Sequence, residues 1–396
     1  MKNEDITSRE GLSLWLAWRP VTNFPTLQEG LKVDVAILGG GIAGITAATL
    51  LKDAGHTVAV IEADRIVQGI SSGATAKVTA GHEIIYDDLT TKLGTASAQK
   101  YATASTKSVE KVADIGRERK IDCDFQRLPL YIYSESGEKT DTIKSECSAA
   151  KALGLPVSYT HDVPLPFTTG PALVYENQAQ FHPRKYLLAL AEDVPGDGSH
   201  IFEKTTALTV KSGDTSDLEV CTDHGSITAD NVVVATHLPV FDPDRLHNHL
   251  SAAERAYALG LYAKEPFPDA MFVEFEPTTH TYRPVPTDKG SMIIVAGEHS
   301  PADTLDKHVY YKRLETYARQ HLEVKSVEYR WSCGDATTDD RLPIIGMTSQ
   351  ESVYVATGFG WWGMCNGTTA AMVITDLITG KENQFADIFN PLRFSL

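Results

Sequence analysis

Cysteine is scarce in this sequence of 396 residues, which contains five cysteines and no Cys-x-x-Cys pair. Their number is odd and they lie far apart, at Cys123, Cys147, Cys221, Cys333 and Cys365. A small secreted protein stabilised by disulfides carries an even set of closely spaced cysteines, so this pattern favours a reducing compartment. We therefore expect a cytoplasmic protein, and we expect no metal site.

Basic residues are also few, because 36 lysines and arginines stand against 52 aspartates and glutamates and leave a net charge of −16. This charge disfavours nucleic acid and anionic membranes as partners. The first twenty residues contain early acids and no uninterrupted apolar stretch, so we expect no secretory signal. The long apolar stretch 35–51 contains glycines near its start, which is typical of a buried strand, turn and helix rather than a membrane span. We expect a small-molecule substrate and leave the oligomeric state open.

One segment, residues 33–62, contains an apolar strand, a Gly-x-Gly-x-x-Gly turn, an apolar helix, a second strand and a terminal acid. Gly39 lets the chain turn off the strand, Gly41 lets the backbone approach a pyrophosphate, and Gly44 lets the helix pack close to the strand. The helix N-terminus offers unpaired N–H groups and a positive dipole end to that pyrophosphate. Glu62 is placed to accept hydrogen bonds from an adenosine ribose, and it disfavours NADP because it repels a 2′-phosphate. The segment predicts a dinucleotide site.

The length and the changing strand pattern predict two domains. Residues 83–120 have apolar positions at helical spacing, 123–133 alternate as in a strand pair, and 255–298 are typical of an antiparallel meander. Residues 227–236 are instead mostly apolar and end in small residues, which predicts a buried parallel strand. We expect a discontinuous dinucleotide-binding domain formed by 1–85, 160–240 and 330–396, with a substrate-binding domain formed by 86–159 and 241–329.

Three separated motifs carry a resemblance to a known family. They are the glycine turn with Glu62, the strand 232–236, and a C-terminal pair of stretches at 340–346 and 353–360. In this order they resemble the FAD-dependent D-amino-acid-oxidase-like oxidoreductases, which include glycine and sarcosine oxidases. The resemblance implies an α/β fold with a glutathione-reductase-type FAD-binding Rossmann domain and an inserted, mainly antiparallel α+β substrate domain. It also implies that the dinucleotide is FAD.

Shorter stretches place the chain near one subgroup of that family. Residues 75–79, 178–183 and 389–391 look like those of members that often carry a C-terminal Rieske iron–sulfur domain. A Rieske centre needs two cysteines and two histidines, and one cysteine, Cys365, follows Cys333 in this sequence. We expect no such centre here, which leaves dioxygen or an external acceptor to reoxidise the flavin.

The resemblance further implies which residues contact FAD. In the family, the glycine turn and second strand meet the adenosine and pyrophosphate, and the loop after residue 69 passes the pyrophosphate and the ring. The C-terminal loop begins a helix whose positive end stabilises the anionic reduced flavin. The expected contacts are Gly39, Gly41, Ile42, Ala43, Gly44, Glu62, Ala63, Ser72, Thr75, Ala76, Lys77, Ala235, Thr236, Cys333, Asp340, Gly358, Gly360, Trp361, Trp362, Gly363 and Met364.

Two positions depart from the amino-acid oxidases. Asp335 stands where glycine-oxidase-like members carry a carboxylate-binding arginine, and Cys365 stands where sarcosine-oxidase-like members carry a lysine. An acid repels a carboxylate and attracts a cation, so the pattern disfavours a simple α-amino acid unless Arg283 supplies the positive charge. We expect Asp335, Arg283 and Lys77 to act in catalysis or substrate binding. The alternatives are an exposed strand arginine for Arg283 and a solvated surface lysine for Lys77.

Cys333 lies seven residues before Asp340, the spacing at which sarcosine-oxidase-like enzymes carry the cysteine bonded to the flavin 8α carbon. The two alternatives for Cys333 are such a thioether and a small buried thiol that packs as a hydrophobe. Trp361 and Trp362 either form the wall of an apolar pocket or pack in the core.

The expected function is that of an FAD-dependent oxidase or dehydrogenase in which hydride passes from a carbon beside a nitrogen to flavin N5. A neutral amine delivers hydride without a strict need for a base, so His82, His182 and His237 are expected to have structural roles. Two alternatives remain: oxidation of a C–H or C–O bond in a larger metabolite, and a partner-dependent electron-transfer flavoprotein. A monooxygenase would need NAD(P)H, and the sequence has one dinucleotide fingerprint.

Overall fold

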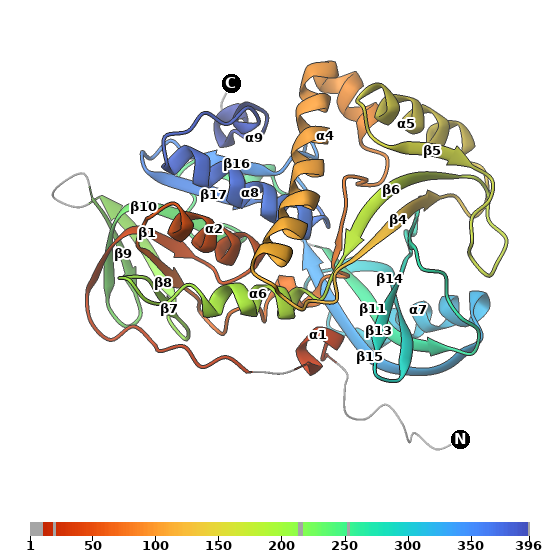
Figure 1. Cartoon of the computed structure of the whole chain (residues 1–396), viewed down its shortest axis with the longest axis horizontal. Coiled ribbons are helices and arrows are strands. Elements are labelled where there is room, and N and C mark those ends of the chain that lie inside the picture. Colours follow the sequence, from red (N-terminus) through yellow and green to blue (C-terminus); the bar gives the residue numbers. More distant parts are fainter. Residues whose placement is uncertain (1–10, 19–20, 213–216, 252–253, 395–396) are drawn as a thin grey trace.

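The computed structural model describes residues 11–18, 21–212, 217–251 and 254–394. Within these ranges the chain forms two sheets, each with its own helices (Figure 1). Helices α2, α6 and α8 accompany the first sheet, and α5 and α7 accompany the second. The long helix α4 stands between the two halves of the molecule.

The first sheet is mainly parallel and is centred on β1. β1 pairs in parallel with β2 and β10, while β17 extends the sheet beyond β10 and β7 extends it beyond β2. β16 pairs antiparallel with β17, and β9 and β8 add an antiparallel extension at β10. The described strands are β1 (Leu31–Leu38), β2 (Val58–Ile61), β7 (His200–Phe202), β8 (Ala207–Ser212), β9 (Leu218–Thr222), β10 (Ser226–His237), β16 (Ile344–Met347) and β17 (Val353–Thr357).

The parallel register decides where a ligand can bind. β2 is buried throughout, and β1 and β10 are buried over their apolar stretches, including Val232, Val233 and Val234 of β10. The carboxyl ends of the three strands lie side by side. Gly39, Glu62 and Ala235 therefore meet at one edge of the sheet. Ligands of open parallel sheets bind outside this edge.

Helices α2 (Ile42–Asp53) and α8 (Gly363–Ile378) pack against each other beside this sheet. They approach closely because Gly367 has no side chain, and a Cβ there would lie 2.8 Å from Ile42 Cγ2. Because α2 follows β1 and α8 follows β17, both helices begin at the edge where the parallel strands end. The other described helices of this half are α1 (Leu14–Ala17), α3 (Ile70–Gly73), α6 (Pro183–Glu192), α9 (Ala386–Phe389) and the 3-10 turn η2 (Pro391–Phe394).

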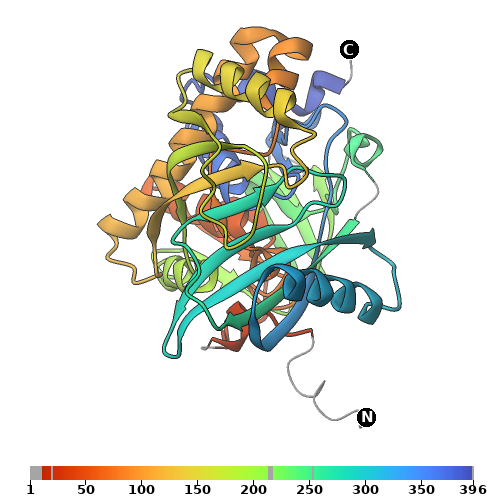
Figure 2. The same cartoon turned by 90° about the vertical axis from the view of Figure 1, so that its right-hand side faces the viewer.

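The second sheet is mixed and mainly antiparallel, and Figure 2 shows it with α7 in front of it. The strand order is β15-β11-β14-β13-β12-β4-β6-β3, with β5 paired to β6 and with β12 parallel to β4. The described strands are β3 (Lys77–Val78), β4 (Gln126–Tyr133), β5 (Val157–Thr160), β6 (Ala172–Gln180), β11 (Glu254–Ala263), β12 (Met271–Glu274), β13 (Thr281–Thr287), β14 (Gly290–Pro301) and β15 (Val324–Asp335). The remaining described helices are α4 (Tyr86–Glu118), α5 (Thr140–Ala152) and α7 (His308–His321), together with the 3-10 turn η1 (Leu246–His249), whose Leu246 packs in the core of the first sheet.

The start of α4 is held by a buried carboxylate from α5. Glu146 accepts hydrogen bonds from the backbone N–H groups of Ile85 (3.0 Å), Tyr86 (2.9 Å) and Asp87 (2.9 Å). These are donors that a helix leaves unpaired at its first turn. Glu146 therefore fixes α4 together with the loop that precedes it. Farther along, Gly94 interrupts the helix with a φ of 82°.

The predicted fold class is confirmed, and two local predictions differ from the structure. Within the stretch 123–133, residues 126–133 form one strand, β4, rather than a strand pair, and before it Asp124 adopts a left-handed φ of 52° that breaks extended backbone. β6 lies in the range 160–240, predicted to belong with the dinucleotide half, yet it pairs with β4 in the second sheet. The domain division as a whole stays a prediction. In the described ranges, no helix is both long and apolar enough to cross a membrane.

Candidate active site

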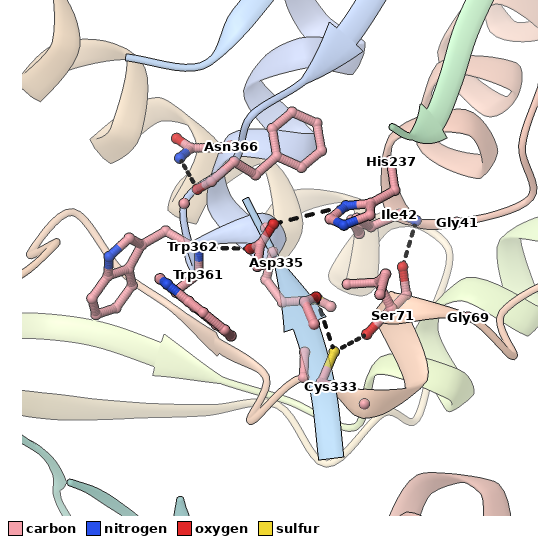
Figure 3. Close-up of a pocket in the computed structure, with 18 of the residues that line it drawn as sticks. Gly41, Ile42, Gly69, Ser71, His237, Cys333, Asp335, Trp361, Trp362 and Asn366 are labelled. Carbon is pink, nitrogen blue, oxygen red and sulfur yellow. Dashed lines mark hydrogen bonds and ion pairs between the residues drawn. The ribbon is translucent and has the colours of Figure 1, made fainter. Parts of the chain in front are cut away.

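A cavity of about 660 Å³ opens where the strands of the first sheet end. Its lining includes the glycine turn after β1, the end of β2 and the loop at the start of α8. Strands β11, β13 and β14 of the second sheet also contribute to the lining. Figure 3 shows the region where α2 and α8 begin. The cavity therefore connects the predicted dinucleotide site with the second half of the molecule.

The glycine turn leaves no room for side chains. Gly39 has a φ of +107°, and a Cβ there would lie 2.4 Å from the Ala235 carbonyl oxygen. A Cβ at Gly44 would lie 1.9 Å from the Gly39 carbonyl oxygen, and one at Gly41 would lie 3.1 Å from Ser71 Oγ. The turn is thus a backbone cradle at the positive end of α2, which suits a pyrophosphate.

Two side chains complete this end of the cavity. Glu62 accepts hydrogen bonds from the N–H groups of Gly40 (2.8 Å) and Asp64 (2.9 Å), and these bonds fix its carboxylate beside the turn. Ser71 Oγ accepts a hydrogen bond from Ile42 N–H at 2.9 Å, as Figure 3 shows. Sequence reasoning selected Ser72 and missed Ser71. The hydroxyl of Ser72 instead lies within hydrogen-bond distance of the carbonyls of Gln68 (2.8 Å) and Gly69 (2.9 Å), and Ser72 is not part of the cavity lining.

Asp335 fixes the loop that begins α8. Its Oδ2 accepts a hydrogen bond from Trp361 N–H at 2.6 Å and its Oδ1 accepts one from Ala336 N–H at 2.8 Å. His237 Nδ1 lies 3.7 Å from Oδ1 (Figure 3). Burial raises the pKa of Asp335, while His237 and the two N–H groups oppose that rise. Asp335 lines the cavity, but both of its oxygens already accept hydrogen bonds from the protein, which suits a positioning role.

Asn366, in the first turn of α8, is a cavity residue that sequence reasoning missed. Its amide nitrogen donates to the Phe359 carbonyl at 2.9 Å. Its Oδ1 is buried and accepts no hydrogen bond from any described residue. A buried polar atom of this kind normally has a partner, so Asn366 provides an acceptor for a bound group. In the sequence, a single amide side chain within an otherwise apolar helix was the feature that could have pointed to Asn366.

Lys77 is buried at the cavity and is therefore not a solvated surface lysine. Its Nζ donates to Thr75 Oγ1 at 3.0 Å and to Thr281 Oγ1 at 3.1 Å, and the residue is 7% exposed. Burial lowers the pKa of Lys77 to about 7, with a further contribution from the charge of Arg283. A catalytic role for Lys77 stays a prediction.

Arg283 does not line the cavity, contrary to the expectation of a substrate or flavin contact. It is not exposed either, because it lies behind the segment that precedes β3 and is 2% exposed. Its Nη1 donates to the carbonyls of Thr75 (2.7 Å), Ala76 (2.9 Å) and Phe181 (3.3 Å). Burial lowers the pKa of Arg283 to about 9. Arg283 therefore supports the cavity wall from the side away from the ligand.

We expect the substitution Arg283→Met to lower the free energy of unfolding by about 3 kcal/mol, because it removes the guanidinium donor that the Thr75, Ala76 and Phe181 carbonyl groups share. Chemical denaturation measures this change, and flavin fluorescence after gel filtration measures a parallel loss of FAD. Arg313→Met removes an exposed arginine and serves as the control. Equal effects of the two substitutions would contradict the supporting role of Arg283.

Cys333 lines the cavity and remains in a thiol-favouring environment. Its Sγ lies 3.4 Å from the Ile70 carbonyl oxygen and 3.7 Å from that of Gly334 (Figure 3). Burial raises the pKa of Cys333 to about 12, and the nearby charge of Asp335 adds to the rise. Formation of a thioether needs the thiolate, so this setting disfavours the covalent alternative.

We therefore expect acid precipitation of the purified protein to release its flavin into the supernatant. Absorbance of the supernatant at 450 nm measures the released flavin, and the Cys333→Ser variant should release the same fraction. Flavin that stays with the wild-type pellet but leaves the Cys333→Ser pellet would instead demonstrate a thioether.

Most of the predicted flavin contacts line the cavity, and their individual roles stay predictions. Gly44, Ser72 and Asp340 are described residues that do not line it. Gly44 acts in packing, because a Cβ there would clash with the Gly39 carbonyl oxygen. Asp340 forms a bidentate ion pair with Arg393. Cys365 also does not line the cavity, because its thiol faces the Ser105 carbonyl of α4.

The histidines and tryptophans divide between the cavity and the core. His182 caps α6 by accepting a hydrogen bond from Lys185 N–H. His82 lines the cavity, stacks on Trp362 with ring centroids 4.7 Å apart, and is neutral because burial lowers its pKa to about 3. Trp361 also lines the cavity and meets the ring of His299 edge-on at 5.3 Å. Both tryptophans thus form part of the wall.

Comparison with known proteins decides the family. Residues 34–377 match the sequence profile described as "FAD dependent oxidoreductase" (DAO). The chain belongs to the DAO family of FAD-dependent oxidoreductases. Its cofactor is FAD, and the glycine cradle, the buried Asn366 acceptor and the two helix N-termini of the cavity fit that group.

The chain is similar to proteins that have several different names. The chain is 32% identical to the "Putative Rieske 2Fe-2S iron-sulfur protein YhfW" of Bacillus subtilis (strain 168), with all of this chain and 78% of that protein covered. It is 22% identical to the "Gamma-glutamylputrescine oxidoreductase" of Escherichia coli (strain K12), with 91% of this chain and 87% of that protein covered.

In the described part of this DAO member, no group of three or more histidine, cysteine or acidic residues could hold a metal.

Solved structures share the fold of this DAO family member. Glycine oxidase from Geobacillus kaustophilus aligns with a TM-score of 0.74 and 20% identity, over 92% of this chain and 99% of that one. L-proline dehydrogenase from P. horikoshii aligns with a TM-score of 0.73 and 19% identity, over 93% and 99%. At these identities the likeness establishes the fold alone.

Proposed function

We propose that the protein oxidises a C–N bond of an amine or amino-acid derivative. The observation that carries this proposal is the single cavity that joins the N-termini of α2 and α8 to a wall from the second sheet. Bound against the glycine turn and the start of α2, FAD would supply the acceptor for a hydride that leaves a substrate carbon. The names of related proteins, among them glycine oxidase and gamma-glutamylputrescine oxidoreductase, support a nitrogen-bearing substrate.

The chain's own residues supply orientation, charge and proton transfer for this reaction. The N–H groups at the start of α8 stabilise negative charge that develops at the cavity. Trp361 and Trp362 restrict water and confine the substrate carbon. A protonated amine has no lone pair to assist hydride departure, so Lys77 Nζ, with its pKa near 7, takes up the ammonium proton.

A second candidate concerns reoxidation rather than the substrate. The similarity to a protein named as a Rieske iron–sulfur protein favours an external electron acceptor over dioxygen. Stopped-flow mixing of the reduced protein with oxygen, and separately with an iron–sulfur or quinone acceptor, distinguishes the two. Slow reaction with oxygen together with fast reaction with an acceptor supports partner-dependent electron transfer.

Anaerobic bleaching of the flavin near 450 nm tests the main proposal. The panel comprises amino acids, N-methyl amines, polyamines and hydroxy acids, with NADH and NADPH as controls. Bleaching by a nitrogen-bearing compound is the expected result. Bleaching by hydroxy acids alone would favour oxidation of a C–O bond in another metabolite, and bleaching by NAD(P)H alone would indicate a reductase or a monooxygenase.

A further inference from the structure

An acidic and a basic residue line the cavity close to the start of α4. Glu83 lies in the loop before α4, and Arg341 lies in the loop before β16. They are close enough to influence each other, because the charge of Arg341 opposes the rise in the pKa of Glu83 that burial causes. The cavity therefore carries a positive and a negative group on the same part of its wall.

The Glu83 carboxylate has no fixed protein partner. Among the described residues it accepts no hydrogen bond and forms no ion pair, although the residue is only partly exposed. Its position is nevertheless well defined, because Glu146 holds the next residues of the loop and α4. A carboxylate that is fixed at a cavity and has no protein partner can bind a cationic group of the ligand.

Arg341 is anchored, yet it keeps donors to spare. Its Nη1 donates to the Ile84 carbonyl at 2.7 Å and lies 3.6 Å from Asp88 Oδ2. A guanidinium has five N–H donors, and this anchor occupies one nitrogen. The remaining nitrogens can bind a carboxylate.

The backbone at both residues is strained. Glu83 has a φ of 59° and Arg341 a φ of 65°, values that residues with a side chain rarely adopt. Among the described non-glycine residues with positive φ, Val67, Ala76, His237 and Trp361 line the same cavity. Strained residues gather at functional sites, which agrees with a role for Glu83 and Arg341 in the ligand site.

We propose that Glu83 and Arg341 bind the zwitterionic head of an amino acid, with the ammonium on Glu83 and the carboxylate on Arg341. This inference rests on the proposed function and narrows its substrate class. The family positions at 335 and 365 are unsuited to this task, since Asp335 holds backbone N–H groups and Cys365 faces α4. An ammonium bound to a carboxylate has no lone pair to assist hydride transfer. The oxidised C–N bond therefore belongs to a second nitrogen of the substrate.

Three matched compounds test this proposal with the FAD-bound protein. L-Lysine carries the zwitterionic head and a second amine, cadaverine lacks the carboxylate, and 6-aminohexanoate lacks the α-ammonium group. Anaerobic titration, followed by the perturbation or bleaching of the flavin spectrum, gives a dissociation constant for each. We expect L-lysine to bind about tenfold or more tightly than either analogue, since each analogue loses one charged contact.

Variants assign each contact to its residue. Glu83→Gln should abolish the preference for L-lysine over 6-aminohexanoate and keep the preference over cadaverine, whereas Arg341→Met should do the reverse. Arg341→Lys keeps the charge and should restore part of the preference over cadaverine. Lys120→Gln, at an exposed residue with a φ of 55° outside the cavity, is the control and should keep both preferences.

Equal affinity of the wild type for all three compounds, or no spectral response to L-lysine, would overturn this assignment. It would also be overturned if Lys77→Met lost the preference for L-lysine over cadaverine while Arg341→Met kept that preference. Failure of the proposed function gives a different pattern. In that case L-lysine perturbs the flavin spectrum with the expected preferences, but no nitrogen compound of either panel bleaches it.

Discussion

Replacement of Gly44 by alanine is expected to yield a protein that retains almost no FAD. The added Cβ would lie 1.9 Å from the carbonyl oxygen of Gly39, which is backbone and cannot rotate away. The helix α2 must therefore move away from β1, and the N–H groups at its start then leave the place where the pyrophosphate binds. We expect a loss of about 3 kcal/mol in the free energy of unfolding and at least a hundredfold weaker FAD binding.

Flavin content after gel filtration and equilibrium titration of the apoprotein with FAD measure this effect. Gly116→Ala is the matched control, because this glycine lies within helix α4 with nothing within 4 Å of its Cβ position. That substitution should leave FAD binding unchanged and stabilise the helix by about 0.5–1 kcal/mol. Normal FAD binding by Gly44→Ala would contradict the close packing of α2 on β1.

The second large effect concerns Lys77, whose replacement by methionine is expected to stabilise the protein at neutral pH. The pKa of Lys77 is about 7 in the folded protein and has an ordinary value of 10.5. Below pH 7 the lysine is charged in both states, and the burial of that charge destabilises the folded state. Between pH 7 and 10.5 the unfolded state holds one more proton, so this destabilisation decreases as the pH rises.

We expect Lys77→Met to raise the free energy of unfolding at pH 7 by about 4 kcal/mol. The difference from wild type should shrink steadily as the pH approaches 10.5. Denaturation curves recorded at intervals of one pH unit measure it. Lys92→Met, at a side chain that is 59% exposed, should change stability by less than about 0.5 kcal/mol at every pH. A constant difference between wild type and Lys77→Met would show that the lysine is not buried in its charged form.

The two departures from the amino-acid oxidases now have a structural explanation. At position 335 the acid does not provide a free charge, because its two oxygens tie β15 to the loop before α8. At position 365 the cysteine packs against α4. The cavity keeps charged groups elsewhere, on Lys77, Glu83 and Arg341. This redistribution of charge is the reason to expect a substrate unlike a simple α-amino acid.

The sequence by itself determined the fold class and the cofactor, and it predicted where the dinucleotide binds. Gly39, Gly41, Gly44 and Glu62 lie within one contiguous strand, turn, helix and strand, whose geometry depends on local backbone freedom and neighbouring apolar residues. Such a unit is predictable because its contacts join residues that are close together in the sequence. The resemblance of the C-terminal stretches then identified the family, which the sequence profile confirmed.

Only the tertiary structure decided which polar residues face the cavity. Arg341 reaches the carbonyl of Ile84 across 257 residues of sequence, and Arg283 reaches Thr75 across 208. No local pattern shows that the first of these arginines lines the cavity and the second supports it from behind. The pairing of β6 with β4 could not be predicted either, because it also joins segments that are far apart in the sequence. Side-chain direction and pKa depend on which distant segments pack together, and that packing is a property of the folded chain as a whole.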